Sequence, residues 1–547
     1  MKKILISASF VIFVSIVFYL AGNNGKVMKD TTEPTSTANY ISPKEKMDEE
    51  IKVEHTRRDN NFLTLWENES ESKSLAPKKV YDLTEMNGYN ILRHNFHGFS
   101  LSYSKTFQVD THQPINYIRL FNGNARIDIT TQNVEKAWTN QHRFINTTLK
   151  HIDAKKVTNL NSNGFTIEIY KYNRPLISSI DSDLNYYAYA FVSKGKFIHT
   201  LQLKTNESNF EEQITTLIDI AKSFQSIEKK EIDPLELVKT TEIAHDISFE
   251  QAKGALTIKD NEFMMGVYHE DSHQFSEWDK TMETKTGLQM FYKAMDSNFD
   301  HFVDELTSDN RVPLITFLFE RKESHDDGVI QGIINGEFDE FIIDWARNIK
   351  ATEKPVLIRL GNEMNGTWSD WSHRTTSNDP DLYKLAFRRI VDLYKKEGAA
   401  NVYFVWNPNN ISDPYFSWNH ASLYYPGDSY VDLIGLTAYN FGETKWNKFR
   451  LFDELYDDLY FEYVRMFPNK PFIVAEVGSH AKGGTHSEFI ENMFTSIPKK
   501  YPNIKMIVWF NSTHAHFDFR LDQDEETINT YKLLIKEPHI IKETNER

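Results

Sequence analysis

The sequence predicts an α/β protein whose C-terminal part is a (β/α)8 TIM barrel, preceded by a small α+β domain, a disordered stalk and an N-terminal hydrophobic anchor. Eight apolar runs alternate with segments of helical periodicity, which is the pattern of a parallel sheet buried on both faces. These units occupy roughly 290 residues, the size of such a barrel. The predicted strands cover residues 264–270, 287–295, 312–320, 355–363, 401–409, 430–440, 471–479 and 504–511.

The N-terminus combines two lysines with an apolar stretch. Lys2 and Lys3 precede a hydrophobic segment from Ile4 to Gly22, which fits either an uncleaved membrane anchor or a secretory signal peptide. At about 19 residues the segment just spans a bilayer, and no clear small-x-small cleavage site ends it. Both alternatives, within residues 1–22, predict that the rest of the chain is extracytoplasmic, either secreted or held at the cell membrane by a single N-terminal pass.

Three further segments follow along the chain. Residues 23–78 are rich in Thr, Ser, Glu, Lys and Asn and cannot bury enough apolar surface to fold, so we predict a flexible linker. Residues 79–232 contain short alternating runs and then a helical pattern, which predicts an α+β accessory domain with antiparallel strands. We find no catalytic constellation in it and assign it no role. Residues 240–547 hold the predicted barrel.

Composition excludes several classes of function. The 547 residues include 62 basic and 78 acidic side chains, a net charge of −16, which argues against nucleic acid as a partner. The absence of cysteine excludes disulfides, thiolate nucleophiles and cysteine zinc sites. The histidine pairs His269/His273 and His514/His516 lack a specific metal-ligand spacing. We therefore expect no metal and no cofactor, and we expect a monomer.

Two glutamates end predicted strands. Glu363 ends the fourth strand, and Glu476 follows the aliphatic run of the seventh, so both are expected at the active-site end of the barrel. Arg359, Gly361 and Glu363 share parity. If they face the interior, Arg359 requires a carboxylate partner, and we also expect Arg359 to bind substrate. A single glutamate at such a position is as often a solvated loop residue. Two converging carboxyls, however, are what glycoside hydrolysis requires. One protonates the leaving oxygen, and the other attacks the anomeric carbon or activates water.

Aromatic residues near the strand ends suit a sugar ligand, because sugar C–H faces pack on flat rings. Trp368 and Trp371 follow a loop glycine, and Trp406 and Trp509 lie inside apolar runs. For Trp406 and Trp509 the alternative that they fill the core stays open, since large side chains fill barrel interiors. His269 is expected to line the same sugar site. Trp446 also falls just after a strand end.

Six stretches of the chain resemble a known family. They are MGVYHE, IINGEFDEFIIDWA, PVLIRLGNEMNGTW, YYPGDSYVDLIGLTAYN, PFIVAEVGS and IVWFN, in this order. Together, over about residues 262–535, they resemble glycoside hydrolase family 26, whose best-known members are β-mannanases. The resemblance implies a retaining mechanism with Glu363 as acid/base and Glu476 as nucleophile. It also implies that Tyr439 hydrogen-bonds the nucleophile and that Trp368 stacks on a sugar.

Two positions depart from the mannanase pattern. Asn362 stands where mannanases usually carry His, and Thr437 stands where they usually carry Asp. Both lie near the expected −1 sugar, so the resemblance leaves the sugar and the linkage open. In the wider clan of barrel glycosidases, an Asn before the acid/base contacts the sugar 2-hydroxyl, which implies a substrate-binding role for Asn362.

The leading hypothesis is a retaining endo-β-glycanase that hydrolyses an extracellular polysaccharide by double displacement. The alternative is a catalytically inactive carbohydrate-binding or envelope-organising protein that kept the barrel. Strands four and seven face each other across a narrow barrel. We therefore predict a carboxyl separation of roughly 5–5.5 Å, which suits direct attack on the anomeric carbon and retention of the β configuration.

Overall fold

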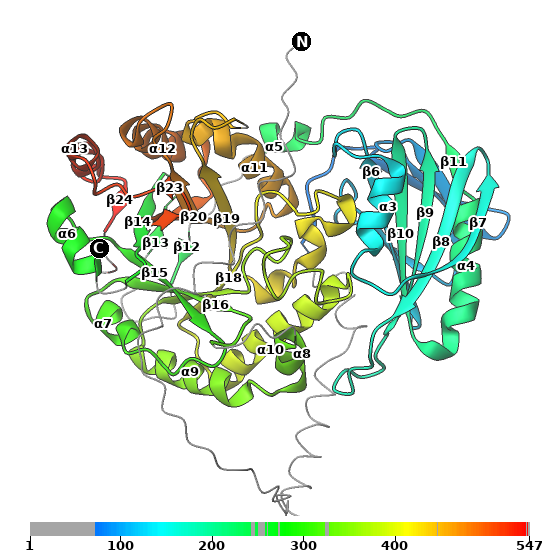
Figure 1. Ribbon diagram of the computed structural model, residues 1–547, viewed down its shortest axis with the longest axis horizontal. Helices are drawn as coiled ribbons and strands as arrows, with labels where there is room; N and C mark the ends of the chain where they lie inside the picture. Colours follow the sequence, from blue (N-terminus) through cyan, green and yellow to red (C-terminus); the bar gives the residue numbers. More distant parts are fainter. Residues whose placement is uncertain are drawn as a thin grey trace, which may run out of the picture.

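The computed structural model describes residues 72–241, 247–249, 257–259, 261–271, 274–322, 328–445, 447–542 and 544. The predicted anchor and nearly all of the predicted linker lie outside these residues. Among the helices that are described, none is long and apolar enough to cross a membrane. The described chain forms a barrel and, beside it, a second body rich in β-structure (Figure 1).

The eight predicted barrel strands are confirmed, each within a few residues of its predicted bounds. They pair in parallel in sequence order, and the ring closes where the first strand pairs with both the second and the last. The strands are β14 (Phe263–Tyr268), β15 (Leu288–Ala294), β16 (Val312–Leu318), β17 (Val356–Leu360), β18 (Val402–Trp406), β19 (Leu433–Asn440), β20 (Phe472–Ser479) and β21 (Ile504–Phe510). A short strand, β24 (Ile540–Ile541), pairs with the start of β14.

Helices alternate with these strands and cover the outside of the barrel (Figure 1). The connection from β18 to β19 is an exception, because its helical turns are three short 3-10 helices and no α-helix. Pro408, Pro414 and Pro426 interrupt that segment, and proline disfavours continuous helix. The α-helices are α6 (Phe275–Met282), α7 (Phe302–Ser308), α8 (Val329–Asn335), α9 (Asp339–Thr352), α10 (Pro380–Glu397), α11 (Phe452–Met466), α12 (His486–Lys500) and α13 (Glu525–Leu534), and the 3-10 helices are η5 (Ser417–Asn419), η6 (Ala421–Tyr424) and η7 (Asp428–Tyr430).

Side chains of the strands alternate between two buried layers. Leu314, Leu357 and Val405 belong to an apolar cluster inside the barrel, while their neighbours along the strands pack against the helices. A small hairpin, β12 (Ile247–Ser248) with β13 (Thr257–Ile258), contributes to the inner cluster. Apolar side chains therefore fill the barrel interior, and the polar groups lie at the C-terminal ends of the strands.

The N-terminal domain contains two antiparallel sheets. One has the order β1-β2-β3-β11 and the other β4-β5-β6-β10-β9-β8-β7. Between the sheets and helix α4 (Phe210–Lys222) lies a separate apolar core. The remaining elements are β1 (Tyr81–Met86), β2 (Tyr89–His94), β3 (Phe99–Ser104), β4 (Gln108–Asp110), β5 (Ile118–Phe121), β6 (Ala125–Asn133), α3 (Gln141–Leu149), β7 (Lys155–Ser162), β8 (Phe165–Asn173), β9 (Tyr186–Lys194), β10 (Phe197–Thr205), η3 (Glu207–Asn209), β11 (Gln225–Ser226) and α5 (Glu236–Thr240).

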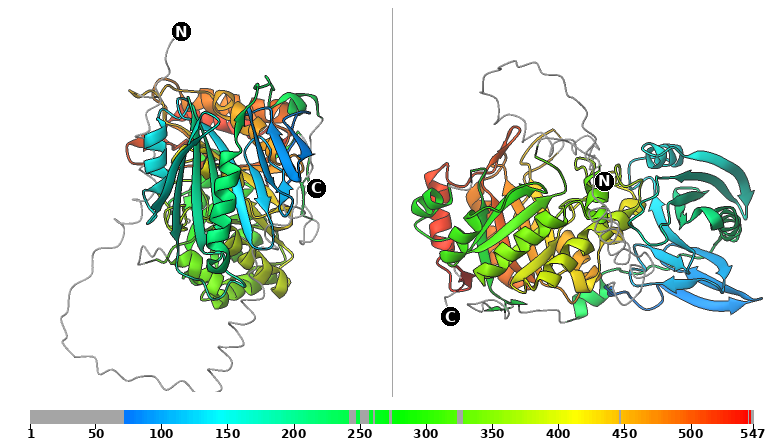
Figure 2. Two further views of the ribbon diagram at one scale, coloured as in Figure 1. Left: turned by 90° about the vertical axis from the view of Figure 1, so that its right-hand side faces the viewer. Right: turned by 90° about the horizontal axis from the view of Figure 1, so that it is seen from below.

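The larger sheet packs against the barrel, as Figures 1 and 2 show from three sides. Its buried polar side chains meet the start of α10. Tyr187 donates a 2.7 Å hydrogen bond to Asp379, and Lys204 lies 2.8 Å from Asp379 and 3.2 Å from Asp381. Arg126 also pairs with Asp381. All of these side chains are buried, so the two domains share one desolvated network of charges.

Removing one member of this network should destabilise the whole chain. We predict that Asp381→Ala lowers the free energy of unfolding by roughly 3–5 kcal/mol, because it leaves buried cations without their partner. Chemical denaturation measures the loss. Glu85→Ala is the control, since it removes only an exposed ion pair with Lys105 and should cost about 1 kcal/mol or less. Equal losses in the two variants would contradict the buried network.

Candidate active site

Glu363 lies in a turn after β17. The sequence predicted a strand through Glu363, but β17 ends at Leu360, and both Gly361 (φ +46°) and Glu363 (φ +56°) adopt left-handed backbone. A Cβ on Gly361 would meet Phe319 and Tyr383, so the parity argument was wrong beyond Leu360. The Glu363 amide donates to the Asn407 carbonyl at 2.8 Å. The unusual backbone of Glu363 is thus held by a neighbouring strand end, as is typical of functional sites.

Glu476 reaches the interior through an irregularity in β20. Ile473 belongs to the inner cluster and Val474 to the outer layer, so strict alternation would point Glu476 toward the helices. The pairing of β20 shifts between Val474 and Val477, on the β21 side, and Glu476 is paired with Thr437 on the β19 side. An extra residue in one strand of a pair changes the direction of the side chains that follow it, and Glu476 therefore points into the interior.

Three side chains donate hydrogen bonds to the Glu476 carboxylate. Arg359 Nη2 and the Tyr292 hydroxyl both donate to Oε1 at 2.6 Å, and the Tyr439 hydroxyl donates to Oε2 at 2.5 Å. The carboxylate partner predicted for Arg359 is therefore present. Burial and the charge of Glu476 raise the pKa of Tyr292 and Tyr439 well above the usual tyrosine range, so both tyrosines stay protonated. Three donors on one carboxylate suit its ionised form.

Arg359 is fully buried beneath this carboxylate. Its Nε donates to Thr316 Oγ1 at 2.8 Å and its Nη1 to Asn407 Oδ1 at 2.9 Å. Burial lowers the pKa of Arg359, but the charge of Glu476, the neighbouring Tyr292 and the hydrogen bonds to both together outweigh it, and the net shift is upward. The arginine was predicted to bind substrate. The structure instead surrounds it with protein groups, so its role is to hold Glu476.

Glu363 carries a proton at neutral pH. Burial, and next the negative charge of Glu476, raise its pKa to about 8. Trp368 Nε1 donates to Glu363 Oε2 at 2.9 Å, which opposes the rise. The site therefore pairs a protonated carboxyl with an ionised one, the division of labour that acid-assisted displacement at an acetal carbon requires.

The tryptophans divide into two groups. Trp368 contacts Glu363, and Trp371 is buried, with its Nε1 donating to the Asn362 carbonyl at 2.7 Å. Trp406 and Trp509 were predicted to bind substrate, but both are completely buried among the residues that face the helices. Their neighbours Val405 and Val508 fill the interior, so alternation turns the two indoles outward. The alternative reading, that they fill the core, is the right one.

Asn362 and His269 lie at the ends of β17 and β14. Asn362 Oδ1 is buried and has no hydrogen-bond partner in the part of the chain that the structure describes. His269 lies 3.4 Å from Asn511 Nδ2 and packs on the Trp278 ring. Burial lowers the pKa of His269 to about 4, so it is neutral at physiological pH.

Tyr292 and Asn407 are site residues that the sequence reading missed. Asn407 Oδ1 accepts from Arg359 and from Thr437, the latter at 3.1 Å. Both residues lie within predicted strands, at positions whose side chains face the interior. Tyr292, for example, is two residues after Met290, which belongs to the inner cluster. A polar side chain at an interior position near a strand's C-terminal end was the signal that would have found them. Trp446 and His273 lie outside the described residues, and among those described no cluster of metal-ligating side chains was found.

Comparison with known proteins agrees with this geometry. Residues 286–545 match the sequence model of glycosyl hydrolase family 26. These residues form a family 26 domain. Strand β14 precedes the matched region and completes its barrel. Members of this family are glycoside hydrolases that retain anomeric configuration.

Individual relatives cover only part of the chain. Endoglucanase H of Acetivibrio thermocellus is 32% identical over 206 residues, which is 37% of this chain and 22% of the relative. A mannan endo-1,4-beta-mannosidase of Bacillus subtilis strain 168 is 28% identical over 218 residues, 38% of this chain and 51% of the relative. The chain thus spans at most about half of either relative. The solved structure of a GH26 beta-mannanase from Bacteroides ovatus is 17% identical, with a TM-score of 0.38, and the match covers 52% of this chain and 92% of that one.

The family 26 domain should show pH-dependent stability that originates at Glu363. Its pKa rises from 4.5 to about 8 on folding. Between these values the folded chain keeps a proton that the unfolded chain has released, so the free energy of unfolding falls as pH rises. Glu363→Gln removes this penalty. Relative to wild type, the variant should gain about 3–5 kcal/mol between about pH 4.5 and 8, measured by chemical denaturation.

The exposed Glu277 on α6 provides a matched control. Glu277→Gln should change stability by a small amount that is the same at each pH, because its carboxyl stays in water in both states. A stability difference for Glu363→Gln that does not grow with pH would show that burial does not hold the Glu363 proton.

Proposed function

We propose that the chain is a retaining endo-β-glycanase that hydrolyses a polysaccharide by double displacement, with Glu363 as acid/base and Glu476 as nucleophile. The observation that carries the proposal is the pairing of the two carboxyls, one protonated because it is buried beside the other, and one held as an anion by three donors. The match of residues 286–545 to glycosyl hydrolase family 26 supports the same class of reaction.

In the first displacement Glu476 attacks the anomeric carbon. Its Oε1 accepts from Arg359 and Tyr292, whereas Oε2 accepts from Tyr439, so Oε2 is the less encumbered oxygen and forms the ester bond. Glu363 transfers its proton to the glycosidic oxygen as that oxygen leaves with the bonding pair. The products are a glycosyl ester on Glu476 and a new free chain end.

In the second displacement Glu363 works as a base. Ester formation removes the negative charge of Glu476, which is the second-largest cause of the raised pKa of Glu363. The pKa of Glu363 therefore falls in the intermediate, and its carboxylate takes a proton from water. The water oxygen attacks the anomeric carbon, the ester bond breaks, and Glu476 and the protonated Glu363 are regenerated with β configuration at the product.

Substrate recognition is proposed for Asn362 and Trp368. The unpartnered Asn362 Oδ1 lies next to the acid/base in sequence and can accept from a sugar hydroxyl. The relatives are named as an endoglucanase and as a mannan endo-1,4-beta-mannosidase, and both names refer to hexose polymers. We therefore propose a β-glycan as the substrate class. The hydrophobic segment after Lys2 and Lys3 supports the further proposal that the substrate is extracellular.

Neutralising either carboxyl should stop hydrolysis. We predict that Glu363→Gln and Glu476→Gln each reduce the release of reducing ends from a β-glycan by at least roughly 10²–10⁴-fold, while circular dichroism shows an unchanged fold. Glu491→Gln, on the exposed face of α12, is the control and should keep full activity. If the wild type binds polysaccharide without releasing reducing ends, the chain is a carbohydrate-binding protein.

The stereochemical outcome is a separate prediction. Direct attack by Glu476 requires a carboxyl separation of roughly 5–5.5 Å, and it yields a first-formed product of β configuration. An activated 2-fluoro glycoside should also leave a covalent ester on Glu476, because fluorine slows hydrolysis of the intermediate. Proton NMR of early products and peptide mapping by mass spectrometry provide the measurements. An α product, or a label on another residue, would contradict the assigned roles.

A further inference from the structure

Two exposed aromatic rings meet where the N-terminal domain joins the barrel. Trp138 is 51% exposed and lies between β6 and α3, and Tyr415 is 54% exposed and lies between β18 and η5. Their ring centroids are 6.5 Å apart and their planes differ by 32°. Trp138 has a left-handed backbone (φ +48°), which is uncommon for a large side chain.

The Tyr415 segment is bonded to the segment that carries the acid/base. Asn365, two residues after Glu363, donates to the Asn409 carbonyl at 3.0 Å and accepts from the Asn409 amide at 2.8 Å. The Asp413 amide donates to the Asn365 carbonyl at 2.9 Å. Asn409 and Asp413 therefore lie beside the segment that carries Glu363, and Tyr415 follows Asp413 by two residues.

The N-terminal domain fixes the same segment from the other side. The Ser417 amide donates to Gln132 Oε1 at 2.7 Å, and the Phe416 ring lies 4.3 Å from the Phe144 ring. Both contacts are made by residues that directly follow Tyr415 in the sequence. Phe416 is buried while Tyr415 is half exposed, so the exposed ring is held next to an anchored residue.

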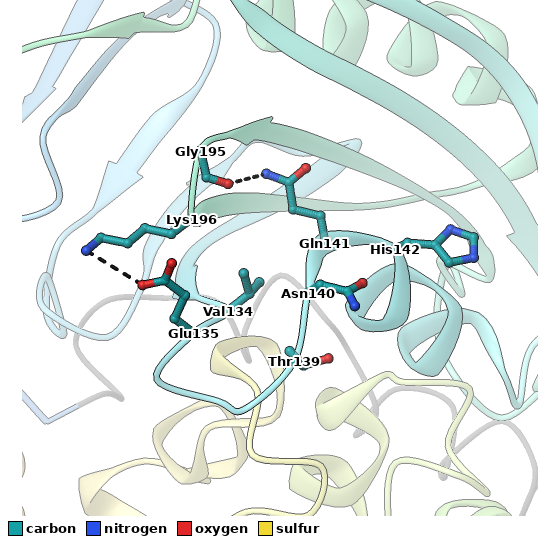
Figure 3. Close-up of a pocket in the computed structure, with 8 residues that line it drawn as sticks. All are labelled: Val134, Glu135, Thr139, Asn140, Gln141, His142, Gly195 and Lys196. Atoms are coloured by element: carbon teal, nitrogen blue, oxygen red, sulfur yellow. Dashed lines mark hydrogen bonds and ion pairs between the residues drawn. The ribbon is translucent and has the colours of Figure 1, made fainter. Parts of the chain in front are cut away.

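A polar pocket on the N-terminal domain is lined by residues that lie on either side of Trp138 in the sequence (Figure 3). It is an open depression of about 440 Å³, and its lining carries carboxylate, amide, imidazole, hydroxyl and ammonium groups. Gln141 Nε2 donates to the Gly195 carbonyl at 2.7 Å, and Lys196 lies 3.8 Å from Glu135. The lining residues are Val134, Glu135, Thr139, Asn140, Gln141, His142, Gly195 and Lys196.

We propose that Trp138, Tyr415 and this pocket form a second glycan-binding site, which holds the polysaccharide strand beyond the sugars that react at Glu363 and Glu476. Flat aromatic faces match the C–H faces of pyranose rings, and the pocket supplies donors and acceptors for their hydroxyls. The occupant is one β-glycan chain that runs from the barrel rim onto the N-terminal domain. This inference rests on the proposed function and gives the N-terminal domain its role.

Binding can be measured apart from catalysis by affinity electrophoresis in gels that contain glucomannan, mixed-linkage β-glucan or β-1,3-xylan. In the Glu476→Gln background of the full chain, Trp138→Ala and Tyr415→Ala should each weaken retardation by about two- to tenfold, the range expected for one aromatic contact. Tyr89→Ala is the matched control, because Tyr89 is an equally exposed ring (54%) on a distant hairpin, and it should bind as the parent does.

Kinetics with the active chain distinguish a glycan contact from a change at the catalytic carboxyls. The double variant Trp138→Ala/Tyr415→Ala should lose more kcat/KM on polysaccharide than on a short aryl glycoside. Equal losses on both substrates, unchanged retardation, or no retardation of the parent by any of the three polysaccharides would each overturn the site. If retardation depends on the two rings but no substrate is cleaved, the binding site stands and the proposed hydrolysis falls.

Discussion

The ion pair between Arg359 and Glu476 determines how the polar side chains at the C-terminal ends of the barrel strands are arranged. A guanidinium with no exposure to water is tolerated only when a carboxylate and further acceptors surround it, and here these are Glu476, Thr316 and Asn407. The same carboxylate takes two tyrosine hydroxyls and, through its charge, keeps the proton on Glu363. One buried cation thus fixes the nucleophile and, indirectly, the protonation state of its partner.

The sequence predicted the elements of the barrel well, because their signal is local. Each strand is an apolar run bounded by polar turns, and the structure confirms all eight. The need of Arg359 for an anion was also foreseen. What alternation alone did not foresee is how the backbone directs the side chains of Glu363 and Glu476 into the interior. A left-handed turn after Leu360 and a register shift within β20 set those directions, and neither leaves a mark that a single sequence reveals.

The sequence also did not predict which side chains, distant from each other in the chain, come into contact in the fold. Trp406 and Trp509 looked suited to a sugar site, yet each is the outward neighbour of a valine that fills the interior. The N-terminal domain was assigned no role because its sequence contains no catalytic constellation. Gln202 and Asn378, which join the domains, are 176 residues apart, and only the folded chain brings such groups together.

The shared charge network also constrains how the protein is made. Domains at the N-terminus fold first during synthesis, so Arg126 and Lys204 are in place long before Asp379 and Asp381 leave the ribosome. Until then the sheet that will meet the barrel carries hydrated cations on an otherwise acidic protein. Docking strips that water when Asp379 and Asp381, at the start of α10, meet Arg126 and Lys204. This desolvation is therefore a late step in the folding of the nascent chain.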